Sequence, residues 1–130
     1  MNTRPLALTA TAALCASLTL AAPATASGGG DDRVVRTGDC SGTADWKLKV
    51  KTDDDKLEVE GEVDSNKSGQ QWTWKIKDNG SVVAKGSATT AGRSGSFSVA
   101  RRIADQSGTD RVVFKASYAG QKCRGVINFG

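Results

Sequence analysis

The chain of 130 residues contains no histidine, only two prolines and three cysteines, and aromatic residues make up 5% of it. Without histidine the protein lacks the side chain that most often exchanges protons near neutral pH, which excludes nucleophile–histidine catalysis and histidine-ligated zinc. Three cysteines are too few for a four-cysteine zinc site or a disulfide-dense miniprotein. The length allows one domain, and 38% hydrophobic residues predict a modest core.

The N-terminal segment has the pattern of a secretory signal peptide. Arg4 precedes an apolar stretch over residues 6–22, and Ala24-Thr25-Ala26 supplies the small residues that signal peptidase accepts. Threonine and serine interrupt the apolar stretch and Pro23 follows it, which disfavours a permanent membrane helix. We therefore expect cleavage after Ala26 and release of an extracellular protein without a membrane anchor.

Removal of residues 1–26 leaves a flexible, glycine-rich tail over residues 27–32 and one domain over residues 33–130. The formal net charge of +4 falls by one, because Arg4 is the one charged residue in the signal segment. A weak positive charge in which both signs are mixed argues against nucleic acid as a partner.

Cleavage also removes Cys15 and leaves Cys40 and Cys123 as the two cysteines of the mature chain. In an oxidising compartment two cysteines pair by default, so we predict a disulfide between them. The bond closes a loop of roughly 80 residues and is expected to contribute about 4–5 kcal/mol on the chain-entropy account.

Apolar and polar residues alternate along most of the domain, which is the period of a half-buried β-strand. The clearest example is the pair of segments 44–52 and 57–63, of which one carries lysines and the other glutamates on its polar face. A two-residue turn at Asp54-Asp55 places Lys49 opposite Glu60 and brings the apolar residues together in the same register. Because one register satisfies both faces, these segments are predicted to form a hairpin with a solvated charge ladder.

Two further hairpins follow from the same alternation. A three-residue turn ending at Gly80 pairs Ile76 with Val82. A four-residue loop pairs Tyr118 with Cys123. With strands over residues 96–103 and 33–37, the count reaches seven or eight. The sequence therefore predicts an immunoglobulin-like antiparallel β-sandwich with one disulfide.

Several segments carry a resemblance to other proteins. They are Cys40-Ser41-Gly42, Trp46-Lys47-Leu48-Lys49, residues 58–66, Gly69-Gln70-Gln71-Trp72, Ser94-Gly95-Ser96-Phe97 and Cys123-Arg124-Gly125. Over residues 33–129 the chain resembles a group of small secreted actinobacterial β-sandwich proteins of uncharacterised function. Its size and strand count are also similar to those of the immunoglobulin-like apoproteins that carry enediyne antibiotics, although that family has two local disulfides. The resemblance implies a secreted bacterial protein and implies no activity.

Trp46, Trp72 and Trp74 are the candidate ligand-binding residues, because tryptophans can form a platform that stacks on sugar rings. All three share the phase of apolar neighbours such as Leu48 and Ile76, which favours core packing. Both interpretations stay open from the sequence.

Three polar segments could hold a charged ligand. Residues 64–69 match the first half of a calcium loop, but Lys75 occupies the twelfth position, where the bidentate glutamate belongs. Asp53-Asp54-Asp55 is explained by turn chemistry. Arg101-Arg102, with Arg93 and Arg111 nearby, could face an anionic wall polymer or an acidic partner, but a solvated strand end is the default interpretation. We predict no metal site and no cofactor.

The sequence thus predicts a secreted, non-catalytic β-sandwich with a binding or structural role at or outside the cell surface. Ordinary serines, lysines and carboxylates on regular strands do not indicate an enzyme. The alternative function is a carbohydrate- or small-ligand-binding module that uses the tryptophan-rich face. A cell-wall polymer, a carbohydrate or another secreted protein are the candidate partners.

Overall fold

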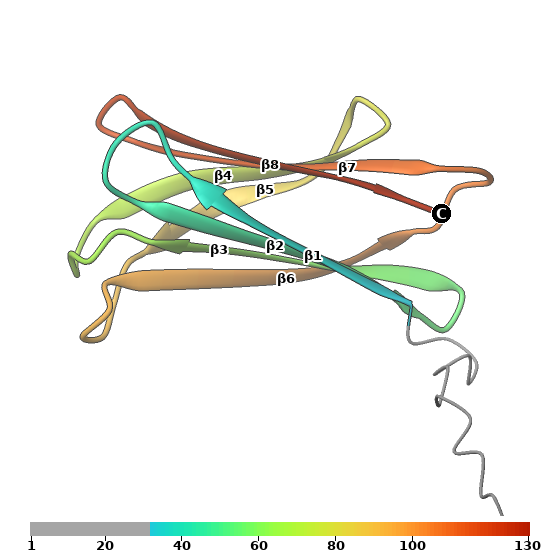
Figure 1. Cartoon of the computed structure of the whole chain (residues 1–130), viewed down its shortest axis with the longest axis horizontal. Coiled ribbons are helices and arrows are strands. Elements are labelled where there is room, and N and C mark those ends of the chain that lie inside the picture. The colour runs from blue at the N-terminus through green and yellow to red at the C-terminus, as the bar shows by residue number, and fades with distance from the viewer. Residues whose placement is uncertain (1–31) are drawn as a thin grey trace, which may run out of the picture.

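The computed structural model describes residues 32–130, which form eight β-strands (Figure 1). The signal peptide predicted over residues 1–26 and nearly all of the tail predicted over 27–32 lie outside the described residues. The strands are β1 (Arg33–Asp39), β2 (Asp45–Asp53), β3 (Lys56–Asp64), β4 (Gln71–Asp78), β5 (Ser81–Thr89), β6 (Ser96–Ala104), β7 (Asp110–Tyr118) and β8 (Gln121–Phe129). Among the described residues, no helix is long and apolar enough to cross a membrane.

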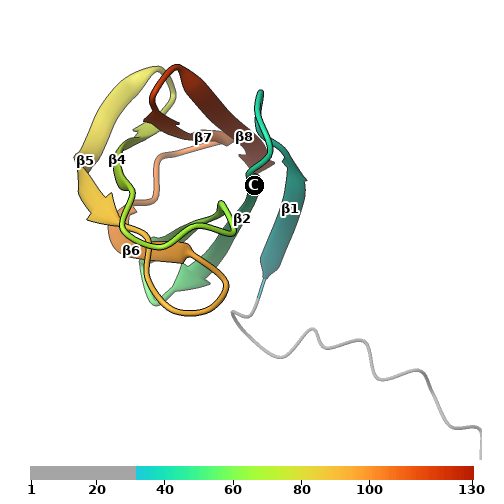
Figure 2. The same ribbon diagram turned by 90° about the vertical axis from the view of Figure 1, so that its left-hand side faces the viewer.

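The strands make two antiparallel four-stranded sheets. The first sheet has the order β1-β2-β3-β6 and the second has the order β5-β4-β7-β8. The chain passes from one sheet to the other after β3, β5 and β6, so that β3 pairs with β6 and β4 pairs with β7. Seen end-on, the strands surround one core (Figure 2). The predicted fold, an immunoglobulin-like β-sandwich of seven or eight strands with one disulfide, is confirmed.

The core contains the alternate residues of both sheets, as the period-two pattern requires. Its fully buried side chains include Leu48, Val50, Val59, Trp72, Ile76 and Phe114. Gly61 of β3 faces the ring of Phe114 in the opposite sheet. A Cβ atom at Gly61 would lie 2.5 Å from that ring, so glycine is required there. The glycine in an otherwise alternating strand therefore makes room for an aromatic residue of the opposite sheet.

The β2–β3 hairpin has the predicted register. Lys49 pairs with Glu60 and Val50 pairs with Val59, around a two-residue turn in which Asp54 has a φ of 56°. This positive φ suits an aspartate, which tolerates the left-handed region better than most residues. Both predicted features of this hairpin, its turn and its charge ladder, are confirmed.

The β4–β5 hairpin differs from the prediction. Its turn consists of Asn79-Gly80 alone, with φ angles of 50° and 87°, which is the conformation that favours tight hairpins. A bulge in β5 then adds one residue to that strand. Together these features move the pairing by two residues, so that Trp74 faces Gly86 and not Ala84.

The β7–β8 hairpin also has a shorter turn than we predicted. Ala119-Gly120 forms a two-residue turn with φ angles of 47° and 82°, and Tyr118 pairs with Gln121. The prediction of a four-residue loop was wrong, because Ala119 occupies the left-handed region that alanine rarely adopts. The shift of two residues leaves the same side chains facing the core, and Cys123 pairs with Ala116.

The predicted disulfide between Cys40 and Cys123 is confirmed. Cys40 lies just after β1 and Cys123 lies in β8, with their Cα atoms 4.3 Å apart across 83 residues of sequence. Ser41 N–H donates to the carbonyl of Lys122 at 2.8 Å beside the bond. The disulfide therefore joins the β1–β2 connection of the first sheet to an edge strand of the second.

Candidate functional site

Two of the three candidate tryptophans lie in the core. Trp72 is fully buried and Trp74 is 4% exposed. Trp72 stacks on Tyr118 with 5.6 Å between ring centroids and donates its indole N–H to Gln70 Oε1 at 3.3 Å. The Arg101 guanidinium lies 5.0 Å from the centroid of the Trp74 ring. These contacts assign both indoles to packing between the sheets.

Trp46 is partly exposed and packs against the margin of the core. Its ring fills the space above two glycines, since a Cβ atom at Gly38 of β1 would lie 2.7 Å from it and one at Gly125 of β8 would lie 2.5 Å from it. The structure therefore does not bring the three tryptophans together on one surface. Ligand binding by Trp46 stays a prediction.

The segment that resembles half of a calcium loop is a connection between β3 and β4. Asn66 N–H donates to Asp64 Oδ1 at 3.1 Å, and Ser65 Oγ donates to the carbonyl of Gly95 at 3.0 Å. The bond from Ser65 ties the connection to the loop between β5 and β6. Within residues 32–130, no group of three or more histidine, cysteine, aspartate or glutamate side chains is arranged to hold a metal ion.

The arginines that the sequence grouped together are distributed over the molecule. Arg101 packs on Trp74, whereas Arg102 forms an ion pair with Asp53 at 2.9 Å. Arg111 belongs to the second sheet. The grouping by sequence proximity failed because successive residues of a strand point to opposite faces.

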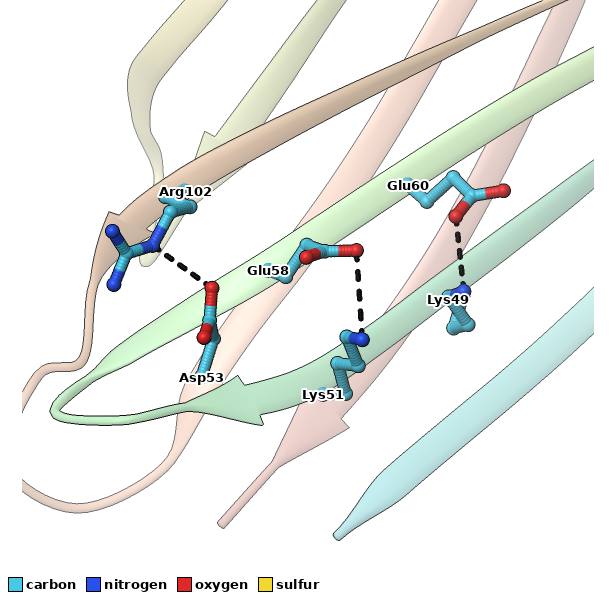
Figure 3. Close-up of polar contacts among 6 residues, drawn as sticks. All are labelled: Lys49, Lys51, Asp53, Glu58, Glu60 and Arg102. Carbon is cyan, nitrogen blue, oxygen red and sulfur yellow. Dashed lines mark ion pairs between the residues drawn. The ribbon is translucent and has the colours of Figure 1, made fainter. Parts of the chain in front are cut away.

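The outward face of the first sheet carries charges of both signs, which pair with each other (Figure 3). Lys49 Nζ lies 2.9 Å from Glu60 Oε2, and Lys51 Nζ lies 3.8 Å from Glu58 Oε1. All three ion pairs of the described residues lie on this sheet. Six charged side chains of this sheet are therefore paired with one another.

One end of this face is acidic. Asp39, Asp45 and Asp64 occupy successive register positions on β1, β2 and β3. A hydrogen bond with the Asp39 side chain, followed by desolvation and the charges of Asp39 and Asp64, raises the pKa of Asp45. Carboxylates in this row repel one another, and their side chains lie near Trp46 around a hollow of about 400 Å³.

All charged side chains on the outward face of the second sheet are cationic. Lys85, Lys75, Lys115 and Arg124 occupy successive register positions across β5, β4, β7 and β8. Neighbouring strands are about 4.8 Å apart, so this row of four positive charges spans roughly 14 Å. Three more cations extend outward from the same strands: Lys77, Arg111 and Lys122. We call these seven side chains the cationic face.

No acidic residue accompanies them. The other outward positions of the four strands hold serine, threonine, glutamine, asparagine and valine, and no described ion pair includes a residue of this face. The pKa of Lys115 is lowered by this concentration of like charges. The charge of Lys77 has the largest effect, and desolvation and the charges of Arg124, Lys75 and Lys122 follow. Like charges that face each other directly destabilise a sheet, so this arrangement has a cost in folding stability.

A hollow of about 310 Å³ lies on this face around Lys75, Lys115 and Arg124. Next to the row of charges is a row of hydroxyl groups, in which Thr73 Oγ1 and Ser117 Oγ lie 2.9 Å apart. The face therefore offers positive charges and neutral hydrogen-bonding groups side by side. Such a surface can bind an anionic ligand that also carries hydroxyl groups or ring oxygens.

Sequence reasoning missed the cationic face. Lysines alternate with apolar residues in β4 and β7, but each strand alone is typical of any solvated sheet. The signal is visible only when the strands are placed in order, because the row is assembled from four strands and three different pairings. Comparison with protein-family models, with curated proteins and with solved structures finds no significant match to the chain.

Proposed function

We propose that this is a secreted, non-catalytic binding protein that holds a linear anionic glycan on the cationic face. The observation that carries the proposal is the row Lys85, Lys75, Lys115 and Arg124, which no carboxylate of the same sheet face neutralises. A polymer with regularly spaced acidic groups can contact several of these cations at once. Its overall affinity then exceeds that of any single weak contact.

The composition of the face favours a glycan over nucleic acid. Proteins that bind single strands combine cations with exposed aromatic side chains on which bases stack. The outward positions of β4, β5, β7 and β8 contain no aromatic residue, and hydroxyl groups such as those of Thr73 and Ser117 lie beside the charges instead. The acid on the glycan can be carboxylate, sulfate or phosphate, since a lysine ammonium binds each as a point charge.

Secretion is supported by the signal-peptide pattern before Ala26 and by the buried disulfide, because disulfides persist in oxidising compartments. Material recovered from the culture medium is expected to begin at Ser27. An intact mass that retains residues 1–26 would contradict this part of the proposal.

The binding function is tested with immobilised dextran sulfate and polygalacturonate, and with uncharged dextran as the control polymer. Wild-type protein is expected to bind both anionic polymers and not dextran. The double variant Lys75→Gln/Lys115→Gln is expected to lose most of this binding. Lys47→Gln, which removes an exposed lysine from the first sheet, serves as the matched control and is expected to bind normally. Binding that is equal in all three proteins, or tighter binding to duplex DNA than to either glycan, would overturn the proposal.

A second candidate is binding of a neutral sugar at Trp46. It is favoured by the partly exposed indole beside the carboxylates of Asp39, Asp45 and Asp64 around one hollow, because sugar sites combine an aromatic surface with acceptors for hydroxyl hydrogens. Quenching of Trp46 fluorescence by iodide, and protection by neutral oligosaccharides, would support it. A Trp46→Phe variant with unchanged oligosaccharide response would exclude it.

A further inference from the structure

Two carboxyl groups are buried at one end of the sandwich, on the core side of the sheet whose outer side is the cationic face. Asp78 ends β4 and Asp110 begins β7, the neighbouring strand. Both are on the core-facing side of the sheet, and they are 2% and 1% exposed. The connection 105–109 between β6 and β7 leads directly into Asp110. Charged side chains are rarely buried this completely without a partner.

The surroundings supply very few donors to this pair. Neither carboxylate oxygen of Asp78 accepts a hydrogen bond from an N–H or O–H group of the described residues. Asp110 Oδ1 accepts one bond, from the backbone N–H of Gln106 at 3.2 Å. No ion pair of the described residues includes either aspartate. Two ionised carboxylates in this position would carry a large desolvation penalty and would also repel each other.

We propose that Asp78 and Asp110 share a single proton in the folded protein, and that this proton holds the ends of β4 and β7 and the connection 105–109 together. The Asp110 hydroxyl donates to a carboxylate oxygen of Asp78, which gives the unpartnered Asp78 side chain its missing hydrogen bond. The arrangement is a pH-sensitive element, because loss of the proton leaves two negative charges in a buried space.

The titratable groups that act on Asp110 agree with this assignment. Burial makes the largest contribution to its raised pKa, and the interaction with the Asp78 carboxyl follows, whereas the Gln106 N–H and the side chain of Asp105 act in the opposite direction. Asp105, in the adjacent connection, also has a raised pKa, first because of its hydrogen bond with Asp110. The ionisation of Asp110 is thus linked to that of Asp105 in the connection and to the Asp78 carboxyl in the core.

The direction of the pH effect follows from the sign of the shift. A carboxyl whose pKa is higher in the folded state than in the unfolded chain stabilises the fold below the ordinary aspartate pKa of 3.8. That contribution is lost as the pH rises through the folded-state pKa. Near neutral pH, a neutral isostere in place of either aspartate should therefore stabilise the fold.

Thermal unfolding of the disulfide-bonded protein between about pH 4 and about pH 8 tests this proposal. The melting temperature of wild type is expected to fall as the pH rises, and Asp110→Asn is expected to melt about 4 °C or more above wild type near neutral pH, with a smaller pH dependence. Asp78→Asn is expected to behave in the same way. Asp55→Asn, in the exposed β2–β3 turn, is the matched control and should follow wild type.

An unchanged pH dependence in Asp110→Asn, or a melting temperature below wild type at neutral pH in both variants, would overturn the proposal. A rise in the wild-type melting temperature with calcium would also overturn it, because a cation and not a proton would then neutralise the pair. Carboxyl carbon NMR of wild-type protein decides the matter if the variants fold poorly. One of the two resonances must titrate well above the ordinary aspartate range, and ionisation of both near the ordinary value would contradict the shared proton.

Discussion

Lys75 of β4 and Lys115 of β7 face each other at the centre of a sheet surface that carries no carboxylate. Facing lysines are unfavourable for folding, and here each has a further cation beside it in the same row, Lys85 or Arg124. The opposite sheet shows that this chain also forms compensated ladders, since its Lys49 pairs with Glu60 at 2.9 Å. The contrast between the two faces is the physical basis of the proposed glycan-binding role.

Binding to an anionic glycan should depend strongly on salt. The screening length falls from about 10 Å at 0.1 M salt to about 3 Å at 1 M, and the cations of the face are mostly exposed. We expect affinity for dextran sulfate to fall at least about tenfold over this range, measured by isothermal titration calorimetry. Affinity that is independent of salt would indicate binding through apolar or neutral contacts elsewhere on the protein.

Reversal of a charge on the first sheet should lower stability by a small amount. Glu60→Lys places a like charge beside Lys49. It is expected to lower the free energy of unfolding by no more than about 1 kcal/mol, because exposed ion pairs are weak. The second change Lys49→Glu should recover most of the loss, as measured by urea denaturation. A double variant with the summed cost of the two single variants would show that the pair does not interact.

Replacement of both Cys40 and Cys123 by serine should lower the unfolding free energy by several kcal/mol, about 4–5 on the chain-entropy account, because the bond closes a long loop. The strand pattern remains intact without the bond, so the circular dichroism spectrum of a sheet should persist at low temperature. Free thiols in the oxidised secreted protein would contradict the disulfide. A variant as stable as wild type would contradict its energetic role.

The β7–β8 turn offers a stabilising change. Ala119 has a φ of 47°, a conformation that costs a residue with a Cβ atom roughly 1–2 kcal/mol. Ala119→Gly relieves this strain but gives the unfolded chain more freedom, so a net gain of up to about 1 kcal/mol is expected in chemical denaturation. Ala88→Gly in β5 is a useful comparison and should destabilise. A loss of stability in Ala119→Gly would contradict the turn geometry.

Alternation, turn residues and cysteine count were sufficient to predict a sandwich of seven or eight strands, the β2–β3 register and the Cys40–Cys123 bond. The other hairpin registers were wrong where a turn contained an unfavourable residue, as at Ala119, or where a bulge added a residue to β5. The cationic face and the Asp78–Asp110 pair could not be predicted, because both join residues of different strands whose order in the sheet was unknown. Period-two patterns fix which way a side chain points and say nothing about which strands are neighbours.

The central claim is that the ligand lies on the outward face of β4, β7 and β8, and amide NMR of the labelled protein tests it most directly. Titration with a short polygalacturonate oligomer should shift the amide signals around Lys75, Lys115 and Arg124 and leave those around Lys49 and Trp46 unchanged. Shifts centred on Trp46 and the row of Asp39, Asp45 and Asp64, or no shifts at an excess of oligomer in low salt, would contradict the account.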